Sequence, residues 1–547
     1  MKKIIQKLAL PICAALAVSG CSGGKMKESQ KSAIAEDPNV TTPGTLPVVK
    51  ESIELELGVS TTQDIEDYKT NAFTKFLEEK TGIKLKFNEM VNPTQKLKIM
   101  LAADDKLPEV LINGVPSDEM LIKYGINGMN TIIDIGEYMD NYGYWLNDMA
   151  KKTTVKNFEK RLYTADGARY FMPNVREQTG NYYCGKAFIN KKWLDKLGLE
   201  MPKTTEDFKK VLEAFANNDP NGNGKKDEIP LTGCYNSWHS VPWHFLVNSF
   251  VYDDFETQMV VDKNDKVSSI YFTDEFEEAL KYINDLYRNG LYDMNAFTQG
   301  AAEVTKIMAQ DDSKIGAFVN SASDSFFSAK PERMADYVAL PPLEGPKGVA
   351  WTTISEAGVG KGAVITKYCQ HPLAAFRFLD FMLSEESSMF NRYGVKGKDW
   401  RDATASDKGL FENIGKKAKF VTILPFGQAQ NSHWQENGPA FRTLDMSDGM
   451  AWDGSPYNGE KFKADALPAY VGKGPKKTFI KGTYTEAESE EMAFIKAEID
   501  MHLDQEIPKF ITGQRSLSEY GAFKQELKNL DFDRYVEILQ AGYDRIK

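Results

Sequence analysis

Residues 51–60 read Glu-Ser-Ile-Glu-Leu-Glu-Leu-Gly-Val-Ser and decide the class of this fold. Their apolar side chains stand at every second position, which is typical of a β-strand with one buried face. A helical stripe of Phe73, Phe76 and Leu77 follows, and Gly82 stands where a glycine commonly ends a helix. Residues 83–87 alternate again. The folded part of the chain therefore starts with a strand–helix–strand unit.

The same alternation continues along the chain. Leu97, Met100 and Leu101 predict a second helix, and residues 108–112 predict a third strand. This order favours an α/β lobe built on a mixed sheet with right-handed crossovers. Later apolar stripes predict further helices at 193–198, 208–215, 273–290 and 372–383, and from residue 486 to the C-terminus with a break at Gly513.

The N-terminus predicts export and a lipid anchor. Three lysines precede a short apolar run at residues 8–18 that is too short to span a bilayer, so residues 1–20 indicate a secretory signal. The run ends in Val18-Ser19-Gly20-Cys21, which resembles the bacterial lipobox. This resemblance implies cleavage before Cys21 and a diacylglycerol on its thiol. A plain secretory signal with an incidental cysteine is the alternative. Residues 21–50, rich in Ser, Gly, Lys, Pro and Thr, predict a flexible tether.

Composition limits the partners. Removing the three lysines of residues 1–20 from 67 basic residues leaves 64 against 78 acidic ones, a formal charge of −14. Phosphate contacts need a basic face, so the composition argues against nucleic acid as a partner. The folded body of about 500 residues is too long for one core and predicts two or more domains. Its cysteines, Cys184, Cys234 and Cys369, have no metal-like spacing, and we expect three buried thiols.

Residues 219–228, Asp-Pro-Asn-Gly-Asn-Gly-Lys-Lys-Asp-Glu, have the spacing of a calcium loop. Calcium takes six to eight oxygen ligands, which a tight loop with alternate inward side chains supplies. The predicted ligands are Asp219, Asn221, Asn223, the carbonyl of Lys225, Asp227 and Glu228. Position twelve is Pro230 and not the bidentate Glu of an EF-hand, so a static site is favoured over a switch. A solvated Asn-Gly turn is the competing interpretation.

Signatures of catalysis are lacking in the sequence. The chain contains no His-Glu-x-x-His, no Gly-x-Ser-x-Gly and no phosphate-binding loop. Nothing near His239 and His244 completes a zinc site. Paired carboxylates of a glycoside hydrolase would leave no sequence pattern, so that class stays open as an alternative.

Aromatic residues alternate with hydrogen-bonding ones in several loop-like segments. Sugars present apolar C–H faces with a rim of hydroxyls, and such segments supply both kinds of contact. Packing inside a core is the competing interpretation for each aromatic. The candidate ligand-binding residues are Tyr183, Asn236, Trp238, Trp351, Trp434, Trp452 and Tyr457.

Four segments resemble the extracellular solute-binding lipoproteins of ABC importers, in particular the large, calcium-containing oligosaccharide binders of the alginate and aldouronate type. They are residues 97–110 (LKIMLAADDKLPEV), 193–231 with the calcium loop, 393–400 (YGVKGKDW) and 509–517 (KFITGQRSL). The resemblance runs from about residue 50 to the C-terminus. It implies two α/β lobes joined by a multi-strand hinge, a ligand held between them, and delivery to a permease.

The resemblance sets the remaining expectations. It implies an N-terminal lobe at 51–175 and 351–415, and a C-terminal lobe at 176–350 and 416–547. It also implies a monomer without catalytic residues, on the outer face of the cytoplasmic membrane. An acidic sugar would need basic partners, for which Arg176 and Lys186 are candidates; neutral plant or algal oligosaccharides are equally open. A binder of peptides or other small solutes, and a surface glycoside hydrolase or lyase, are the alternative functions.

Overall fold

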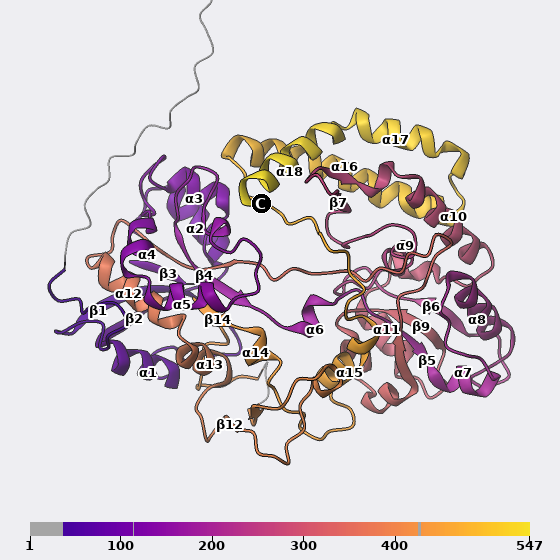
Figure 1. The fold of residues 1–547 in the computed structure, drawn as a ribbon, viewed down its shortest axis with the longest axis horizontal. Helices are drawn as coiled ribbons and strands as arrows, with labels where there is room; N and C mark the ends of the chain where they lie inside the picture. The colour runs from indigo at the N-terminus through magenta and orange to yellow at the C-terminus, as the bar shows by residue number, and fades with distance from the viewer. Residues whose placement is uncertain (1–36, 113, 425–427) are drawn as a thin grey trace, which may run out of the picture. The chain divides into compact units, whose positions relative to one another are not determined.

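The computed structural model describes residues 37–112, 114–424 and 428–547 (Figure 1). The expected signal at 1–20, the lipidation site Cys21 and the tether up to residue 36 lie outside the described residues. Within the described part of the chain, none of the helices combines the length and the apolar character needed to cross a membrane.

The first sheet has six strands in the order β14-β4-β11-β3-β1-β2. The strands predicted at 51–60, 83–87 and 108–112 are confirmed as β1, β2 and β3, of which β1 starts at Ile53 and β3 at Val110. Ile53 pairs with Ile83 in parallel register. β11 runs antiparallel to β3 and β4, so the other strands all end at the same edge. The strands are β1 Ile53–Ser60, β2 Ile83–Met90, β3 Val110–Ile112, β4 Phe171–Arg176, β11 Gly360–Ile365 and β14 Ala440–Arg442.

Helices pack against this sheet around a first hydrophobic core that contains Leu57, Leu111 and Phe376. Gly82 ends α1 with a φ of 77°, the left-handed conformation that the sequence predicted for it. The helices are α1 Ala72–Thr81, α2 Pro93–Ala102, α3 Asp118–Tyr124, α4 Gly136–Tyr142, α5 Tyr144–Lys152, α12 Pro372–Met382 and α13 Glu385–Tyr393, with the 3₁₀ turn η1 Lys160–Leu162.

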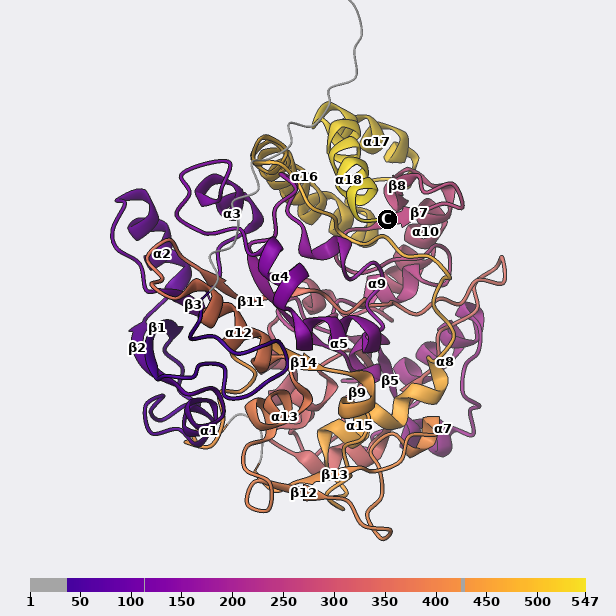
Figure 2. The ribbon, with the colours of Figure 1, turned by 60° about the vertical axis from the view of Figure 1, so that its left-hand side comes forward.

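The second sheet has four strands in the order β10-β5-β9-β6 around a second core that contains Phe188, Phe276 and Phe318. The strands are β5 Ala187–Asn190, β6 Ile229–Thr232, β9 Ile315–Val319 and β10 Tyr337–Leu340. The main helices are α7 Lys191–Leu197, α8 Thr205–Asn217, α9 Pro242–Val247, α10 Asp274–Arg288, α11 Ala301–Met308 and α15 Gly459–Ala466. The C-terminal helices α16 Glu486–Thr512, α17 Tyr520–Asn529 and α18 Phe532–Ile546 lie together in Figures 1 and 2.

The chain passes between the two cores three times. These crossing segments are residues 177–186, which contain α6 Thr179–Tyr182, residues 341–359, and residues 443–458, which contain α14 Leu444–Ser447. Smaller elements are the strand pairs β7 Met259–Val261 with β8 Val267–Ser269, and β12 Trp400–Asp402 with β13 Phe420–Thr422. Short 3₁₀ turns are η2 Ile270–Phe272, η3 Met294–Phe297, η4 Ser323–Phe327, η5 Pro331–Asp336, η6 Glu412–Ile414, η7 Leu467–Ala469 and η8 Leu517–Glu519.

Two segments pack elsewhere than the sequence indicated. Residues 37–50 were expected in the tether, but Val48 and Val49 are buried in the first core and Arg377 donates to the carbonyl of Thr41 at 2.8 Å. Residues 430–442 were expected in the C-terminal lobe, but Phe441 joins the first core and β14 pairs with β4. Residues 440–442 belong to the first sheet because they form backbone hydrogen bonds with β4, although the chain on both sides of them leads to the second core.

Candidate functional site

The predicted calcium loop joins α8 to β6. Thr204 and Asp207 form a capping box that starts α8, and Phe208, Leu212 and Phe215 bury its inner face, so the loop begins at a rigid helix end. The Asp219 carboxylate accepts the backbone N–H groups of Gly222 at 2.9 Å and Gly224 at 3.0 Å, which closes the loop. Both glycines have left-handed φ angles, near 75°, that side-chain-bearing residues rarely adopt.

The side chains of this loop converge. The amides of Asn221 and Asn223 both donate to Oδ1 of Asp227 at 3.1 Å. Oδ1 of Asn221 accepts the backbone N–H of Asn223 at 3.0 Å, and Oδ1 of Asn223 accepts that of Lys225 at 2.8 Å. Oε1 of Glu228 is buried and has no hydrogen-bond partner among the described residues. The oxygen-rich set therefore fits a hard cation such as calcium.

Two features of the loop limit this fit. Lys314 lies 2.9 Å from Oδ2 of Asp227 and holds the pKa of that carboxyl below its ordinary value. No group of three or more His, Cys, Asp or Glu side chains that could hold a metal occurs in the described ranges. Three of the six ligands predicted for the loop are the amide oxygens of Asn221 and Asn223 and the carbonyl oxygen of Lys225, and none of these belongs to a His, Cys, Asp or Glu side chain.

The crossing segments join matching edges of the two sheets. β4 and β14 end at Arg176 and Arg442, which stand opposite each other in register. In the second sheet, Ala187 at the start of β5 pairs with Leu340 and Val319, so β9 and β10 end at the edge where the chain enters. Ligands of open α/β sheets bind outside the carboxyl ends of strands. Arg176 at the first edge and Trp238 in the loop beyond the second edge are both partly exposed.

Several predicted ligand residues gather at the second edge. The loop after β6 carries Trp238, whose side chain is 38% exposed, and Asn236, whose Oδ1 accepts the N–H of Ala301 at 2.7 Å. Asn236 also lines a hollow of about 620 Å³ with Tyr235 and Glu303. Trp351 lies half-buried on a crossing segment. Asn236 and Trp238 therefore share the loop after β6, and Trp351 lies on the segment that follows β10.

Tyr183 and Trp452 each pack against a small third cluster of Leu410, Phe411, Ala464 and Leu467. The Tyr183 hydroxyl accepts the N–H of Gly472 at 3.2 Å, and Trp452 Nε1 donates to the carbonyl of Ser455 at 2.8 Å. Tyr457, 43% exposed, follows five residues after Trp452. This cluster brings segments from positions 183 and 452 together, although their distance in sequence gives no hint of it.

Trp434 was expected at the ligand, and the structure contradicts that expectation. Its side chain is fully buried in the first core, with its ring 5.1 Å from that of Phe73 and 5.7 Å from that of Phe87. Its indole N–H donates to Thr74 Oγ1 at 3.0 Å. An aromatic residue among hydrogen-bonding ones can be a core residue as well as a sugar platform, and the sequence does not distinguish the two at Trp434.

Lys186 is also fixed inside the protein. Its ammonium donates to the carbonyl of Gly180 at 2.8 Å and to that of Tyr183, so it ties α6 to the start of β5. Only 1% of Lys186 is exposed, and burial lowers its pKa to about 8. Lys186 therefore stabilises the crossing segment 177–186 from inside the protein and has almost no exposed surface for a ligand.

Beside Trp238 lies a row of aromatic rings that the sequence did not predict. The His239 ring lies 5.1 Å from Trp238 and 4.8 Å from Phe255, and burial lowers the His239 pKa to about 4. Next to it, His244 Nδ1 lies 2.7 Å from Oδ2 of the fully buried Asp253. A neutral His239 extends the apolar platform of Trp238. No motif marks this arrangement, because Phe255 comes from a separate loop.

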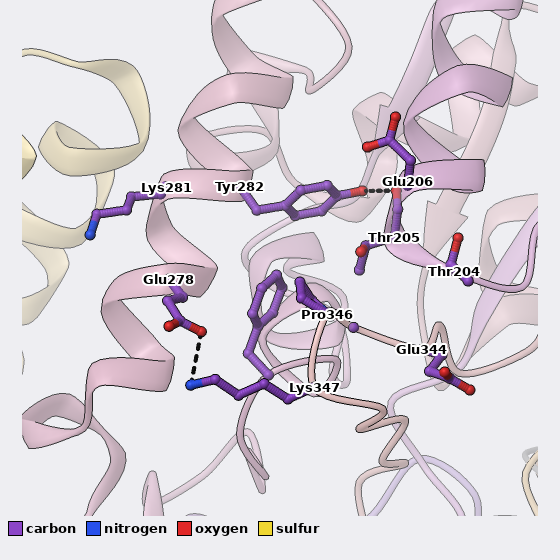
Figure 3. Close-up of a pocket in the computed structure, with 11 residues that line it drawn as sticks. Thr204, Thr205, Glu206, Glu278, Lys281, Tyr282, Glu344, Pro346 and Lys347 are labelled. Carbon is purple, nitrogen blue, oxygen red and sulfur yellow. Dashed lines mark hydrogen bonds and ion pairs between the residues drawn. The ribbon is translucent and has the colours of Figure 1, made fainter.

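A second hollow, of about 640 Å³, lies between the start of α8, α10 and residues 344–347 of a crossing segment (Figure 3). Tyr282 of α10 donates to the carbonyl of Thr205 at 2.7 Å, and Lys347 forms an ion pair with Glu278 at 3.1 Å. Both groups are thus occupied by neighbours drawn in the same view. This hollow contains none of the predicted site residues.

The thiols are free in the structure. Cys184 and Cys234 are buried, as expected, while Cys369 is only half-buried. Burial raises the pKa of Cys184 to about 12, so it is protonated at neutral pH.

Comparison with known proteins agrees with this architecture. Residues 60–389 match the family of bacterial extracellular solute-binding proteins. The chain belongs to this family. The fructooligosaccharide ABC transporter substrate-binding protein FusA of Streptococcus pneumoniae is 26% identical over 563 residues, which span 99% of this solute-binding protein and 98% of FusA.

Solved structures show the two-lobe fold. An extracellular solute-binding protein from Bifidobacterium longum subsp. infantis aligns with a TM-score of 0.74 at 21% identity, over 91% of this chain and 98% of its own. FusA in complex with kestose aligns at 0.66 and 23%, over 90% and 99%, and an EF-hand mutant of FusA has also been solved. Alginate-binding protein AlgQ2 without calcium ion aligns at 0.59 and 18%, over 91% and 99%. The predicted α/β two-lobe class is confirmed.

Proposed function

We propose that this solute-binding protein binds an oligosaccharide between its two lobes and delivers it to the membrane subunits of an ABC importer. The observation that carries the proposal is the match to FusA over 99% of the chain. That match includes both sheets and all three crossing segments. The ligand would lie outside the carboxyl ends of the two sheets, where the crossing segments join them.

The proposed contacts are stacking surfaces and hydrogen-bonding groups. Trp238, supported by the neutral His239, offers a platform for the apolar face of a sugar ring. Polar side chains such as those of Asn236 and Arg176 would form hydrogen bonds with the sugar hydroxyls. The proposed ligand-binding residues are Arg176, Tyr183, Asn236, Trp238, Trp351, Trp452 and Tyr457, and Trp434 is withdrawn because it is a core residue.

We also propose a structural calcium ion in the loop after α8. The side chains of Asp219, Asn221, Asn223, Asp227 and Glu228, with the carbonyl of Lys225, would hold it. The convergence of the two amides on Asp227 and the orphaned Oε1 of Glu228 support this assignment. The solved structures of AlgQ2 without calcium ion and of an EF-hand mutant of FusA are consistent with this assignment. The ion would neutralise the carboxylates and hold α8 against β6.

Anchoring and delivery complete the proposal. A diacylglycerol on Cys21 would hold a monomer on the outer face of the cytoplasmic membrane, within reach of its permease. Ligand that bridges both lobes would favour the closed arrangement of the crossing segments, and the permease would read that arrangement. No bond is made or broken, and the acidic body does not bind nucleic acid.

The test is a thermal-shift panel combined with product analysis. Oligosaccharides should raise the melting temperature of the protein in proportion to the logarithm of their concentration above Kd, with every glycan recovered intact. Shortened glycans in the mixture would indicate a hydrolase or lyase. Stabilisation by peptides alone would indicate a peptide-binding member of the family.

A further inference from the structure

A further hollow, of about 660 Å³, lies on the lobe that is built around the first core. It lies between the starts of α5 and α13 and the end of α12, which contacts both other helices (Figure 1). We call it the Tyr144 hollow. The lining residues that matter for its chemistry are Tyr144, Trp145, Asn147, Lys151, Phe381 and Glu385.

The Tyr144 hollow is separate from the ligand position between the lobes. Every residue that lines it belongs to the first lobe. α5 approaches the crossing segment 177–186 at its other end, where Glu177 accepts the N–H of Thr154 at 2.6 Å. The nine residues of α5, at 1.5 Å each, place about 14 Å of helix between the hollow and that contact. A ligand in the hollow would therefore not bridge the two lobes.

An exposed aromatic ring forms one wall of the hollow. Tyr144 is 54% exposed, and its ring lies 5.3 Å from that of Trp145 in a T-shaped arrangement. The Trp145 ring in turn lies 5.2 Å from that of the buried Phe381. Exposed rings of this kind offer the apolar surface on which the C–H face of a sugar ring stacks. The pair thus presents one open ring that is supported by the core.

The protein holds Tyr144 in a fixed position. The backbone N–H groups of Tyr144 and Trp145 both donate to Oδ2 of the buried Asp380, at 3.0 and 3.2 Å. The backbone at Gly44 lies against the Tyr144 ring, because a Cβ there would be 2.8 Å from Cε2 of the ring. Gly44 has a φ of 81°, which glycine adopts without strain. A ring fixed in this way loses little freedom when a ligand binds.

Polar groups beside the rings have hydrogen-bonding capacity to spare. The side-chain amide of Asn147 and the indole N–H of Trp145 form no hydrogen bond with any residue that the structure describes. Asn147, Lys151 and Glu385 are exposed. Together these groups supply donors and acceptors around the apolar surface of Tyr144. Binding sites for sugars combine the same two kinds of surface.

The charges around the hollow are balanced. Asp148 forms an ion pair with Lys152 at 2.7 Å, and Glu386 forms one with Lys80 at 2.9 Å. The other charged residues of the lining are one glutamate and one lysine, whose charges cancel. Coulomb attraction therefore favours neither an anion nor a cation. An uncharged ligand suits the hollow.

The two helix starts do not make the hollow an anion site. The first N–H groups of α5 donate to Asp380, and Ser384 Oγ accepts the N–H of Ser387 at the start of α13 at 3.2 Å. Anions bind at helix N-termini through N–H groups that lack such partners. The protein itself occupies these donors, so a ligand must be held by the aromatic and polar side chains.

We propose that the Tyr144 hollow is a second carbohydrate site, which binds a neutral oligosaccharide by stacking on Tyr144 and by hydrogen bonds to Asn147, Trp145 and Glu385. An uncharged sugar has both the apolar face and the hydroxyl rim that this wall complements. Because its residues belong to one lobe, the site is present whether the lobes are open or closed. The inference goes beyond the proposed function, since it holds a glycan at the surface without delivering it.

The test counts binding sites by calorimetry. Neutral xylo-, manno-, cello- and fructo-oligosaccharides are titrated into the protein up to several times the expected weak Kd, on the order of 1 mM. We expect one tight site between the lobes and one weak site. A tight site alone would overturn the inference and leave the proposed function standing. A weak site alone would refute the proposed function and leave the inference standing. Absence of both sites would refute both.

Variants assign the weak site to the hollow. Tyr144→Ala should weaken it about tenfold and leave the tight site unchanged, while Trp238→Ala should weaken only the tight site. Tyr144→Phe keeps the ring and should bind within about twofold of the unmodified protein, and Asn147→Ala should weaken the weak site severalfold. Tyr163→Ala, which removes another exposed ring of the same lobe, is the matched control. A weak site that survives Tyr144→Ala, or equal losses at both sites, would overturn the inference.

Discussion

The Asp380 carboxylate of α12 accepts the backbone N–H of Leu146 at 2.8 Å, although 234 residues separate them in the sequence. It also accepts the N–H groups of Tyr144 and Trp145 and so caps the start of α5. An acidic group at a helix N-terminus interacts favourably with the helix dipole. One buried side chain thus joins two helices of the first core.

Asp380 should make the stability of the first core depend on pH. Burial, opposed by the three N–H groups, raises the pKa of Asp380 from 3.8 to about 6. The folded state then binds the proton more tightly than the unfolded state, so the free energy of unfolding falls as pH rises from about 4 to about 6 and is level above that. The loss is on the order of 2–3 kcal/mol.

The check is urea denaturation of Asp380→Asn at pH 4 and pH 7. The variant cannot titrate, so its stability relative to the unmodified protein should improve as the pH rises. Asp148→Asn, at an exposed ion pair with Lys152, serves as the control and should show no such change. Parallel pH profiles for Asp380→Asn and the unmodified protein would contradict the assignment.

Chelation of calcium should lower the melting temperature of the protein. The loop after α8 would lose the cation that balances Asp219, Asp227 and Glu228, while the sheet edges stay unchanged. We expect a fall of several degrees, corresponding to about 1–3 kcal/mol of linked binding free energy. Ligand specificity should not change. Asp227→Asn should have a low melting temperature that EDTA no longer affects, and the same EDTA response in variant and unmodified protein would refute the site.

Trp434 and Trp238 should respond differently to truncation. Trp434→Ala removes a fully buried ring and its hydrogen bond to Thr74, so it should cost about 3–5 kcal/mol of stability. Trp238→Ala removes a partly exposed ring and should change stability by about 0.5 kcal/mol or less, but weaken sugar binding. Denaturation curves and calorimetry separate the two effects. A Trp434→Phe variant that folds but loses sugar binding would restore Trp434 as a ligand residue.

Glu356 should link the lobes through a modest interaction. Its Oε1 lies 2.7 Å from Lys156 Nζ and 3.0 Å from Thr478 Oγ1, so one carboxylate on a crossing segment touches segments from either side. A double-mutant cycle of Glu356→Gln and Lys156→Met should give a coupling of about 0.5–1 kcal/mol, weaker at high salt, because Lys156 is half exposed. A coupling of zero at low salt would show that the ion pair contributes nothing.

The sequence alone determined the local features of this protein. Alternating residues at 53–60 and the glycine at position 82 specify β1 and the end of α1, because period and backbone freedom act over a few residues. The spacing of Asp219, Asn221 and Asn223 predicted a converging loop for the same reason. The family also followed from short segments.

Tertiary structure alone decided which residues face a ligand. The segment Ser432-His433-Trp434-Gln435 has the pattern of a sugar-binding loop, but Trp434 is fully buried in the first core. Arg176 and Arg442 stand 266 residues apart and lie opposite each other because β14 pairs with β4. Strand pairing over such distances depends on the whole fold, so sequence periodicity predicts the individual strands but not which of them lie side by side.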